Sequence, residues 1–114
     1  SGVKQNRAEA AKWFRKAAAQ GDGDAQFTLG HMYDQGDGVK KDTKEAVKWY
    51  VKSAEQGFDQ AQLKLGRMYS RGQGVKQDKK EALKWFGKAA AQGSEEAIKT
   101  LEILGAHPLL KGAN

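Results

Sequence analysis

The sequence repeats itself with a period of 36 residues, and this repeat limits the fold more than any other feature. Residues 25–60 align with residues 61–96 without a gap, and 20 of the 36 aligned positions are identical. The second half of the same unit also matches residues 2–21, and residues 97–101 match its beginning. A period of this length is typical of stacked helical hairpins, in which each unit buries its apolar face only against its neighbours. The sequence therefore predicts an all-α solenoid.

Each unit contains two segments with the spacing of an amphipathic helix. Ala25, Leu29 and Met32 fall on one face of the first segment, while Ala46 and Trp49 begin the apolar face of the second. A single proline and abundant Ala, Lys, Glu and Gln also favour helices over strands. We expect about six antiparallel helices, near residues 6–20, 24–35, 42–56, 60–71, 78–92 and 95–104.

Capping residues mark the expected ends of these helices. Asp42, followed by Glu45, and the equivalent Asp78 have the pattern of an N-cap with an acidic residue three positions later. Asn6 occupies the equivalent position near the start of the chain, so we expect the first helix to begin there. A glycine follows the last glutamine of each second helix, where a left-handed residue is typical. These glycines are Gly21, Gly57 and Gly93.

The chain is expected to form a single domain over residues 1–105. Its 114 residues are too few for two domains, and it has no apolar run long enough to cross a membrane. It shows neither a signal peptide nor a cysteine. Because a leader removed before Ser1 would leave no trace, the compartment stays open, with export or a periplasmic location among the options. The expected parts are a half repeat (2–24), two full repeats (25–60 and 61–96), a terminal helix (97–105) and a C-terminal tail (106–114).

One pattern is complete in both full repeats, from residue 25 to 57 and from residue 61 to 93: A-x-x-x-L-G-x-x-Y-x-x-G-x-G-V-x-x-D-x-x-x-A-x-x-W-[YF]-x-K-x-A-x-x-G. It resembles the Sel-1-like repeat, a relative of the tetratricopeptide repeat. The resemblance covers nearly the whole chain, and it implies a right-handed α-solenoid that acts as an adaptor scaffold for protein complexes. Asp59 and Glu95 depart from the family pattern, which usually has a small apolar residue at that position.

Residues 36–42, GDGVKKD, combine glycines and lysines ahead of a helix, which are the ingredients of a phosphate-binding loop. Such a loop needs a preceding strand and the spacing G-x-x-x-x-G-K-[ST], whereas this loop follows a helix and has the spacing G-x-G. Asp42 is also placed to cap the N–H groups that would hold a phosphate. We therefore interpret the loop as a turn, in which Gly36 and Gly38 adopt positive φ and Val39 fills the space between helices.

The sequence does not predict an enzyme. His31 and His107 are the only histidines and no cysteine accompanies them, so neither a catalytic triad nor a metal site has partners at a usable spacing. Some Sel-1-like repeat proteins are linked to β-lactam binding or hydrolysis, but no serine nucleophile motif occurs in this sequence. No cofactor is predicted. One alternative stays open, a small-molecule or cell-wall-fragment binding or hydrolytic site with His31 and Arg67 as its nucleus.

Nucleic-acid binding is a second alternative, suggested by the net charge of +6. The helix lysines, however, follow glutamates at a spacing of three, such as Glu45 before Lys48, which is typical of an exposed, ion-paired helix face. The aromatic residues follow the apolar spacing, and we expect the repeated pairs to be buried between helices rather than to stack on bases. These pairs are Trp13–Phe14, Trp49–Tyr50 and Trp85–Phe86.

The favoured hypothesis is a non-enzymatic scaffold that binds a protein or peptide in the groove lined by the first helix of each repeat. If the tetratricopeptide-like geometry holds, positions flanking the buried Leu-Gly pair face this groove. Phe27 and Leu63 are then candidate apolar anchors, with His31 and Arg67 beside them as candidate hydrogen-bond donors. Packing of these side chains against the next helix is an open alternative. The predicted partner-binding residues are Asp24, Phe27, His31, Asp34, Gln60, Leu63, Arg67, Ser70 and Lys99, with Glu96 and Ile103 at equivalent positions.

The N-terminal helix has no first helix before it in this sequence, so one of its apolar flanks lacks the usual cover. A longer solenoid, a second copy of the chain or the C-terminal tail could supply that cover. In the tail, Leu109 and Leu110 follow Pro108. Self-association through the N-terminal helix is therefore a further hypothesis.

Overall fold

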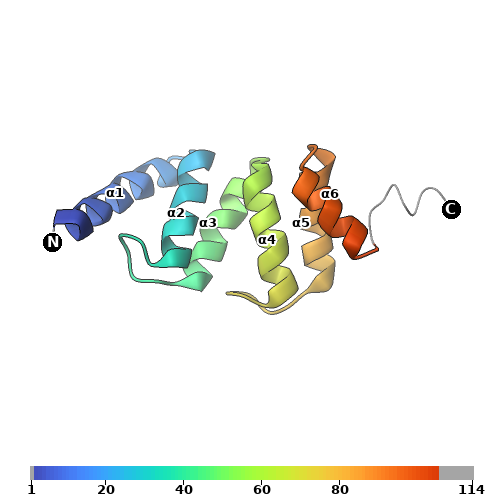
Figure 1. The fold of residues 1–114 in the computed structure, drawn as a ribbon. Helices are drawn as coiled ribbons and strands as arrows, with labels where there is room; N and C mark the ends of the chain where they lie inside the picture. Colours follow the sequence, from blue (N-terminus) through green and yellow to red (C-terminus); the bar gives the residue numbers. More distant parts are fainter. Residues whose placement is uncertain (1, 106–114) are drawn as a thin grey trace.

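The computed structural model describes residues 2–105, which form helices joined by short loops (Figure 1). The helices are α1 (Gly2–Ala19), α2 (Gly23–Gln35), α3 (Thr43–Glu55), α4 (Asp59–Arg71), α5 (Lys79–Ala91) and α6 (Glu95–Ile103). The predicted all-α repeat fold is confirmed, and this part of the chain contains no strand. None of these helices is both long and apolar enough to cross a membrane. The tail, with His107 and the two leucines after Pro108, lies outside the described residues.

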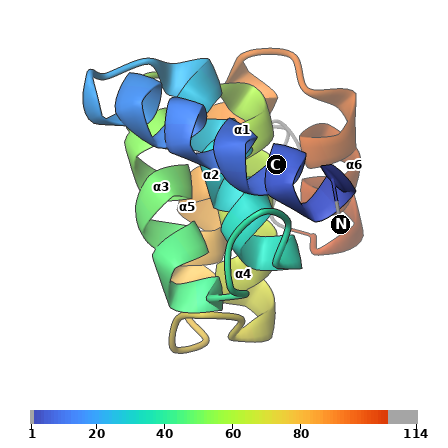
Figure 2. The ribbon, with the colours of Figure 1, turned by 90° about the vertical axis from the view of Figure 1, so that its left-hand side faces the viewer.

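The helices stack in chain order, each packed against the next. α2 with α3 and α4 with α5 form the two helical hairpins of the full repeats, while α1 and α6 lie at opposite ends of the stack (Figure 1). Figure 2 looks along the stack and shows α3 and α5 on one side and α4 and α6 on the other. We call α2, α4 and α6 the A helices, and α1, α3 and α5 the B helices.

The core lies between consecutive helices, where each hairpin buries the apolar face that it cannot bury alone. One cluster joins Tyr50 of α3, Leu65 of α4 and Trp85 of α5, and these side chains are at most 5% exposed. A second cluster joins Phe86 of α5 and Leu101 of α6. Each such side chain contributes about 1.5–3 kcal/mol when it leaves water. The stack is therefore held together mainly by contacts between neighbouring helices.

Asp42 and Asp78 cap α3 and α5 as predicted. Each carboxylate accepts a hydrogen bond of 3.1 Å from the backbone N–H three residues later. The predicted cap at Asn6 is wrong, since α1 begins at Gly2 and Asn6 lies inside it. The Asp42 N–H also donates to the Tyr33 carbonyl of the preceding A helix (2.9 Å), which holds this segment outside α3. No described A helix precedes Asn6, so the equivalent segment continues α1 instead.

The glycine loop after α2 is a turn, and it docks on the preceding B helix. Gly36 and Gly38 have φ of 69° and 79°, as predicted. A Cβ on Gly38 would lie 2.3 Å from the carbonyl oxygen of Arg7 in α1, so only glycine permits this approach. Gly74 makes the same approach to the Thr43 carbonyl in the next repeat, at 2.7 Å. The loop therefore joins neighbouring repeats.

Pairs of glutamines also join neighbouring repeats. The buried Gln62 donates a hydrogen bond to the Ala54 carbonyl (3.1 Å) and accepts one from the Gln92 amide (2.8 Å). Gln26 and Gln56 make the equivalent contacts one repeat earlier. Because both ends of the buried amide are satisfied, a polar side chain is tolerated inside an otherwise apolar interface.

The repeated tryptophans differ in burial. Trp85 is 5% exposed, Trp49 is half-buried and Trp13 is 67% exposed. The prediction that all of them are buried is therefore wrong for Trp13. Trp85 lies against Ala54 of the preceding B helix, whereas no described B helix precedes α1. The repeat pattern marks the same face of each helix, but the neighbouring helix decides whether that face is covered.

Tyr50→Phe is expected to raise the free energy of unfolding by about 1 kcal/mol, measured by urea denaturation. The Tyr50 hydroxyl is buried without a hydrogen-bond partner among the described residues, and burial raises its pKa. The equivalent position in the next repeat is Phe86, so the stack already accepts phenylalanine there. A clear loss of stability in Tyr50→Phe would contradict this account, since it would mean that the hydroxyl contributes a hydrogen bond.

Candidate partner-binding surface

The A helices present a surface that the core does not bury, which we call the A face. Its positions are separated by four and then three residues, so they share one side of each helix. None of its side chains is buried. The A face consists of Asp24, Thr28 and His31 on α2, Gln60, Lys64 and Arg67 on α4, and Glu96, Thr100 and Ile103 on α6.

The predicted apolar anchors lie against neighbouring helices instead of on the A face. Leu63 is 3% exposed and packs with residues of α5 and α6, so the packing alternative holds there and we remove Leu63 from the candidate surface. Phe27 is half-buried against the core, with its ring centroid 5.6 Å from that of Tyr50. Lys99 occupies the equivalent position on α6 and is exposed, because no described helix covers it.

Ion pairs link successive A helices. The carboxylate of Asp34 lies 3.7 Å from the Lys64 ammonium, and the Arg67 guanidinium pairs with the Glu96 carboxylate. Lys64 was not among the predicted site residues. Asp34 and Lys64 are 30 residues apart in the sequence. An alignment with the 36-residue period pairs residues 36 apart, so it does not match these two. Each pair is partly exposed and contributes little to stability, but it fixes where these side chains lie.

Three predicted residues of the A face are exposed and carry unoccupied polar groups. The side chains of Asp24, His31 and Gln60 make no hydrogen bond or ion pair to other residues of the described chain. Imidazole and amide groups can each donate and accept, which matches the alternating N–H and C=O groups of an extended peptide. Ser70 lies elsewhere, in a separate hollow of about 230 Å³ beside Leu83.

The described residues do not assemble a metal-binding cluster. Within residues 2–105 no group of three His, Cys, Asp or Glu side chains could hold a metal ion. His31 and Arg67, the nucleus suggested for a small-molecule site, are joined by no contact there, and Arg67 is paired with Glu96. At the glycine loop, the Asp42 carboxylate occupies the N-terminus of α3, where a phosphate would have to bind.

Comparison with protein families finds three consecutive matches to the family model described as the Sel1 repeat, at residues 1–22, 23–58 and 59–94. The matched ranges keep the period of 36 residues and begin two residues before the units of our alignment. No curated protein sequence matches the chain significantly.

Solved structures with the same fold include three bacterial repeat proteins. The protective antigen c5321 of uropathogenic Escherichia coli, which displays an SLR fold, is 45% identical over 82% of this chain and 20% of its own, with a TM-score of 0.80. A Sel1 repeat protein from Oxalobacter formigenes is 42% identical over 84% of this chain and 40% of its own, with a TM-score of 0.82. Helicobacter pylori cysteine rich protein B is 33% identical over 82% of this chain and 70% of its own, with a TM-score of 0.78. This chain spans less than half the length of the first two.

Proposed function

Because the chain belongs to the Sel1 repeat family, we propose that it is a non-enzymatic scaffold that binds a protein or peptide segment on its A face. Sel1 repeat proteins are generally protein-interaction scaffolds and typically lack catalytic activity. The observation that carries the proposal is the set of exposed, unoccupied polar groups on this face. In this proposal the described repeats act as one domain, and the partner is an extended segment that runs across the A helices.

The ion pairs between A helices support the proposal. The Asp34–Lys64 and Arg67–Glu96 pairs fix neighbouring side chains before any partner arrives, which lowers the ordering cost of binding. A partner that crosses from α2 to α4 would meet His31 and Arg67, which occupy equivalent positions of the two helices.

The double variant His31→Ala/Arg67→Ala is expected to weaken such binding by about tenfold or more, because two polar contacts at the middle of the surface are lost. Peptides are first selected from a phage-displayed random library on the immobilised protein. Their dissociation constants for wild type and variant are then measured by fluorescence anisotropy, and circular dichroism confirms that the variant is folded.

The matched control is Lys12→Ala/Lys48→Ala, which changes two exposed lysines on the B helices. It should leave the affinity of the selected peptides within about twofold of wild type, because exposed charges away from the contact contribute little. Selected peptides that bind the His31→Ala/Arg67→Ala variant as tightly as wild type would overturn the assignment of the A face.

Self-association remains a separate proposal that the exposed flank of α1 supports. Val3 and Trp13 are 73% and 67% exposed on this helix. The same flank would equally accept a preceding repeat of a longer solenoid, as the equivalent Trp85 accepts the preceding B helix.

A further inference from the structure

Charge is strongly divided between the two edges of the stack. We call one edge the loop edge: residues 2–7, 36–44 and 71–80, which lie along the lower side of Figure 1 around the loops between A and B helices. It carries nine basic and three acidic residues. The opposite edge, formed by the turns at 20–24, 55–60 and 92–96, carries six acidic residues and no basic one.

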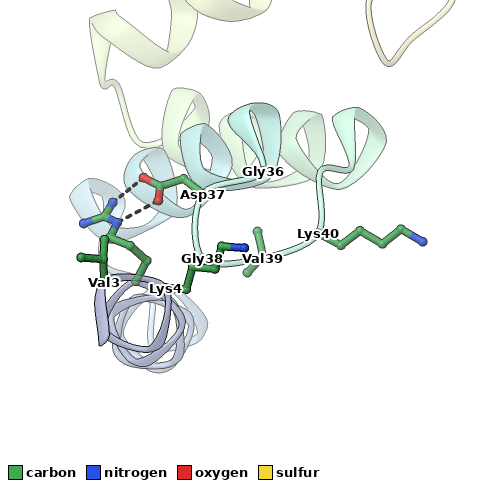
Figure 3. Close-up of a pocket in the computed structure, with 8 residues that line it drawn as sticks. Val3, Lys4, Gly36, Asp37, Gly38, Val39 and Lys40 are labelled. Carbon is green, nitrogen blue, oxygen red and sulfur yellow. Dashed lines mark hydrogen bonds and ion pairs between the residues drawn. The ribbon is translucent and has the colours of Figure 1, made fainter. Parts of the chain in front are cut away.

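The three carboxylates of the loop edge are already engaged. Asp37 accepts a hydrogen bond of 2.8 Å from Arg7 Nε and forms an ion pair with the same guanidinium, which lowers the pKa of the Asp37 carboxyl (Figure 3). Asp42 and Asp78 cap α3 and α5 through hydrogen bonds of 3.1 Å. Neither capping carboxylate forms an ion pair with a cation of the described residues.

Eight cations of the loop edge are exposed and form no ion pair within the described chain. The B-helix lysines differ, because Lys48 and Lys84 pair with glutamates three residues earlier. The net charge of +6 is therefore concentrated on the loop edge rather than spread over the surface. The eight residues are Lys4, Lys40, Lys41, Lys44, Arg71, Lys76, Lys79 and Lys80.

Hollows lined by both charged and apolar side chains lie along the loop edge. The first, of about 420 Å³, is lined by Val3 and Lys4 of α1 and by the loop that carries Val39 and Lys40. Figure 3 shows the Lys4 side chain extending toward this loop. A second hollow of about 480 Å³ lies on the other side of this loop, beside Tyr33. A third, of about 730 Å³, repeats the second one unit later, with Tyr69, Val75 and Lys76 at the equivalent positions.

We propose that the loop edge is a second binding surface, which takes an extended acidic protein segment with apolar residues between its carboxylates. The exposed lysines pair with the carboxylates, and the hollows beside Val39 and Val75 take the apolar side chains. The second and third hollows recur with the repeat, so a segment in which acidic and apolar residues recur would match them. This surface is distinct from the A face and does not depend on it.

The aromatic side chains beside the loop edge, Tyr33 and Tyr69, favour a polypeptide over a nucleic acid. Single-stranded nucleic acids bind through exposed aromatic rings on which bases stack. The Tyr33 hydroxyl instead accepts a hydrogen bond from Arg15, whose guanidinium also lies over the ring, and Tyr69 packs against the core.

The probe is a fluorescein-labelled peptide of about 15 residues that repeats Glu-Leu-Ser; it places apolar residues between its carboxylates and spans about 50 Å when fully extended. Binding is measured by fluorescence anisotropy at about 0.15 M salt, where exposed charges beyond roughly 8 Å are screened. The variant Lys40→Gln/Lys76→Gln/Lys80→Gln is expected to bind about tenfold more weakly, because three exposed pairs are lost. The control Lys12→Gln/Lys48→Gln/Lys99→Gln removes the same net charge elsewhere and should change the affinity less than about twofold.

Each outcome decides the proposal. Absence of binding to the Glu-Leu-Ser peptide overturns the proposal. An equal loss of affinity in both triple variants also overturns it, because the net charge of the protein would then explain the binding. If a Glu-Ser-Ser peptide binds as tightly as the Glu-Leu-Ser peptide, the proposed binding of apolar side chains in the hollows is wrong. Tighter binding of single-stranded DNA, with the same loss in the Lys40→Gln/Lys76→Gln/Lys80→Gln variant, overturns the choice of partner. Variants of His31 and Arg67 should leave this binding unchanged, which separates it from binding on the A face.

Discussion

Trp85→Ala is expected to lower the free energy of unfolding by about 3–5 kcal/mol, the usual cost of removing a large buried aromatic side chain. Trp85 is 5% exposed and packs in the cluster that contains Tyr50 of α3 and Leu65 of α4. Its removal therefore opens a cavity where three consecutive helices meet. The effect is measured by urea denaturation with circular dichroism as the signal. Fluorescence is less suitable, because the substitution itself removes a tryptophan.

Trp13→Ala is the matched control, because Trp13 occupies the equivalent position of α1 and is 67% exposed. Its ring lies beneath the Lys16 ammonium, 5.0 Å from the centroid, and such an exposed contact contributes about 0.5–1 kcal/mol. We expect Trp13→Ala to cost no more than this, with half-buried Trp49 giving an intermediate loss. Equal losses at Trp13 and Trp85 would contradict the burial that separates them.

The tryptophans show how far the fold could be predicted from the sequence. The 36-residue period correctly predicted the helix-on-helix stack, and five of the six helices begin and end within one residue of their predicted bounds. A prediction from the repeat, however, assigns the same environment to all equivalent positions. The helix that covers a side chain belongs to the neighbouring unit, so the environment differs where the described chain lacks that neighbour. Trp13 and Asn6 were mispredicted for this one reason: their equivalents contact a preceding helix, and the described residues contain no helix before α1.

The candidate site was less predictable, because contacts between units do not follow the repeat period. Arg7 with Asp37 and Gln26 with Gln56 are each 30 residues apart, six fewer than the period. Alignment by 36 residues places equivalent side chains in one register, and it cannot show which side chains meet across the stack. For the same reason, the sequence did not predict that Lys64 of α4 pairs with Asp34 of α2.

Gly66→Ala is expected to lower the free energy of unfolding by about 1–2 kcal/mol, even though alanine favours a helix by about 1 kcal/mol over glycine. Gly66 lies inside α4, and a Cβ there would be 2.6 Å from two ring atoms of Phe86. The Phe86 ring is 2% exposed and has no room to move away. The added methyl group therefore forces α4 and α5 apart, which also loosens the packing of the ring itself.

Gly87→Ala separates this steric cost from helix propensity. Gly87 lies inside α5, on the helix that carries Phe86, and a Cβ there would meet no atom within 4 Å. Only the gain in helix propensity remains, so Gly87→Ala should raise the free energy of unfolding by about 0.5–1 kcal/mol in the same urea titration. The same substitution would then have opposite signs on two packed helices of equal length. Stabilisation by Gly66→Ala would contradict the close approach of α4 and α5, because a relaxed interface would accept the methyl group and keep the propensity gain.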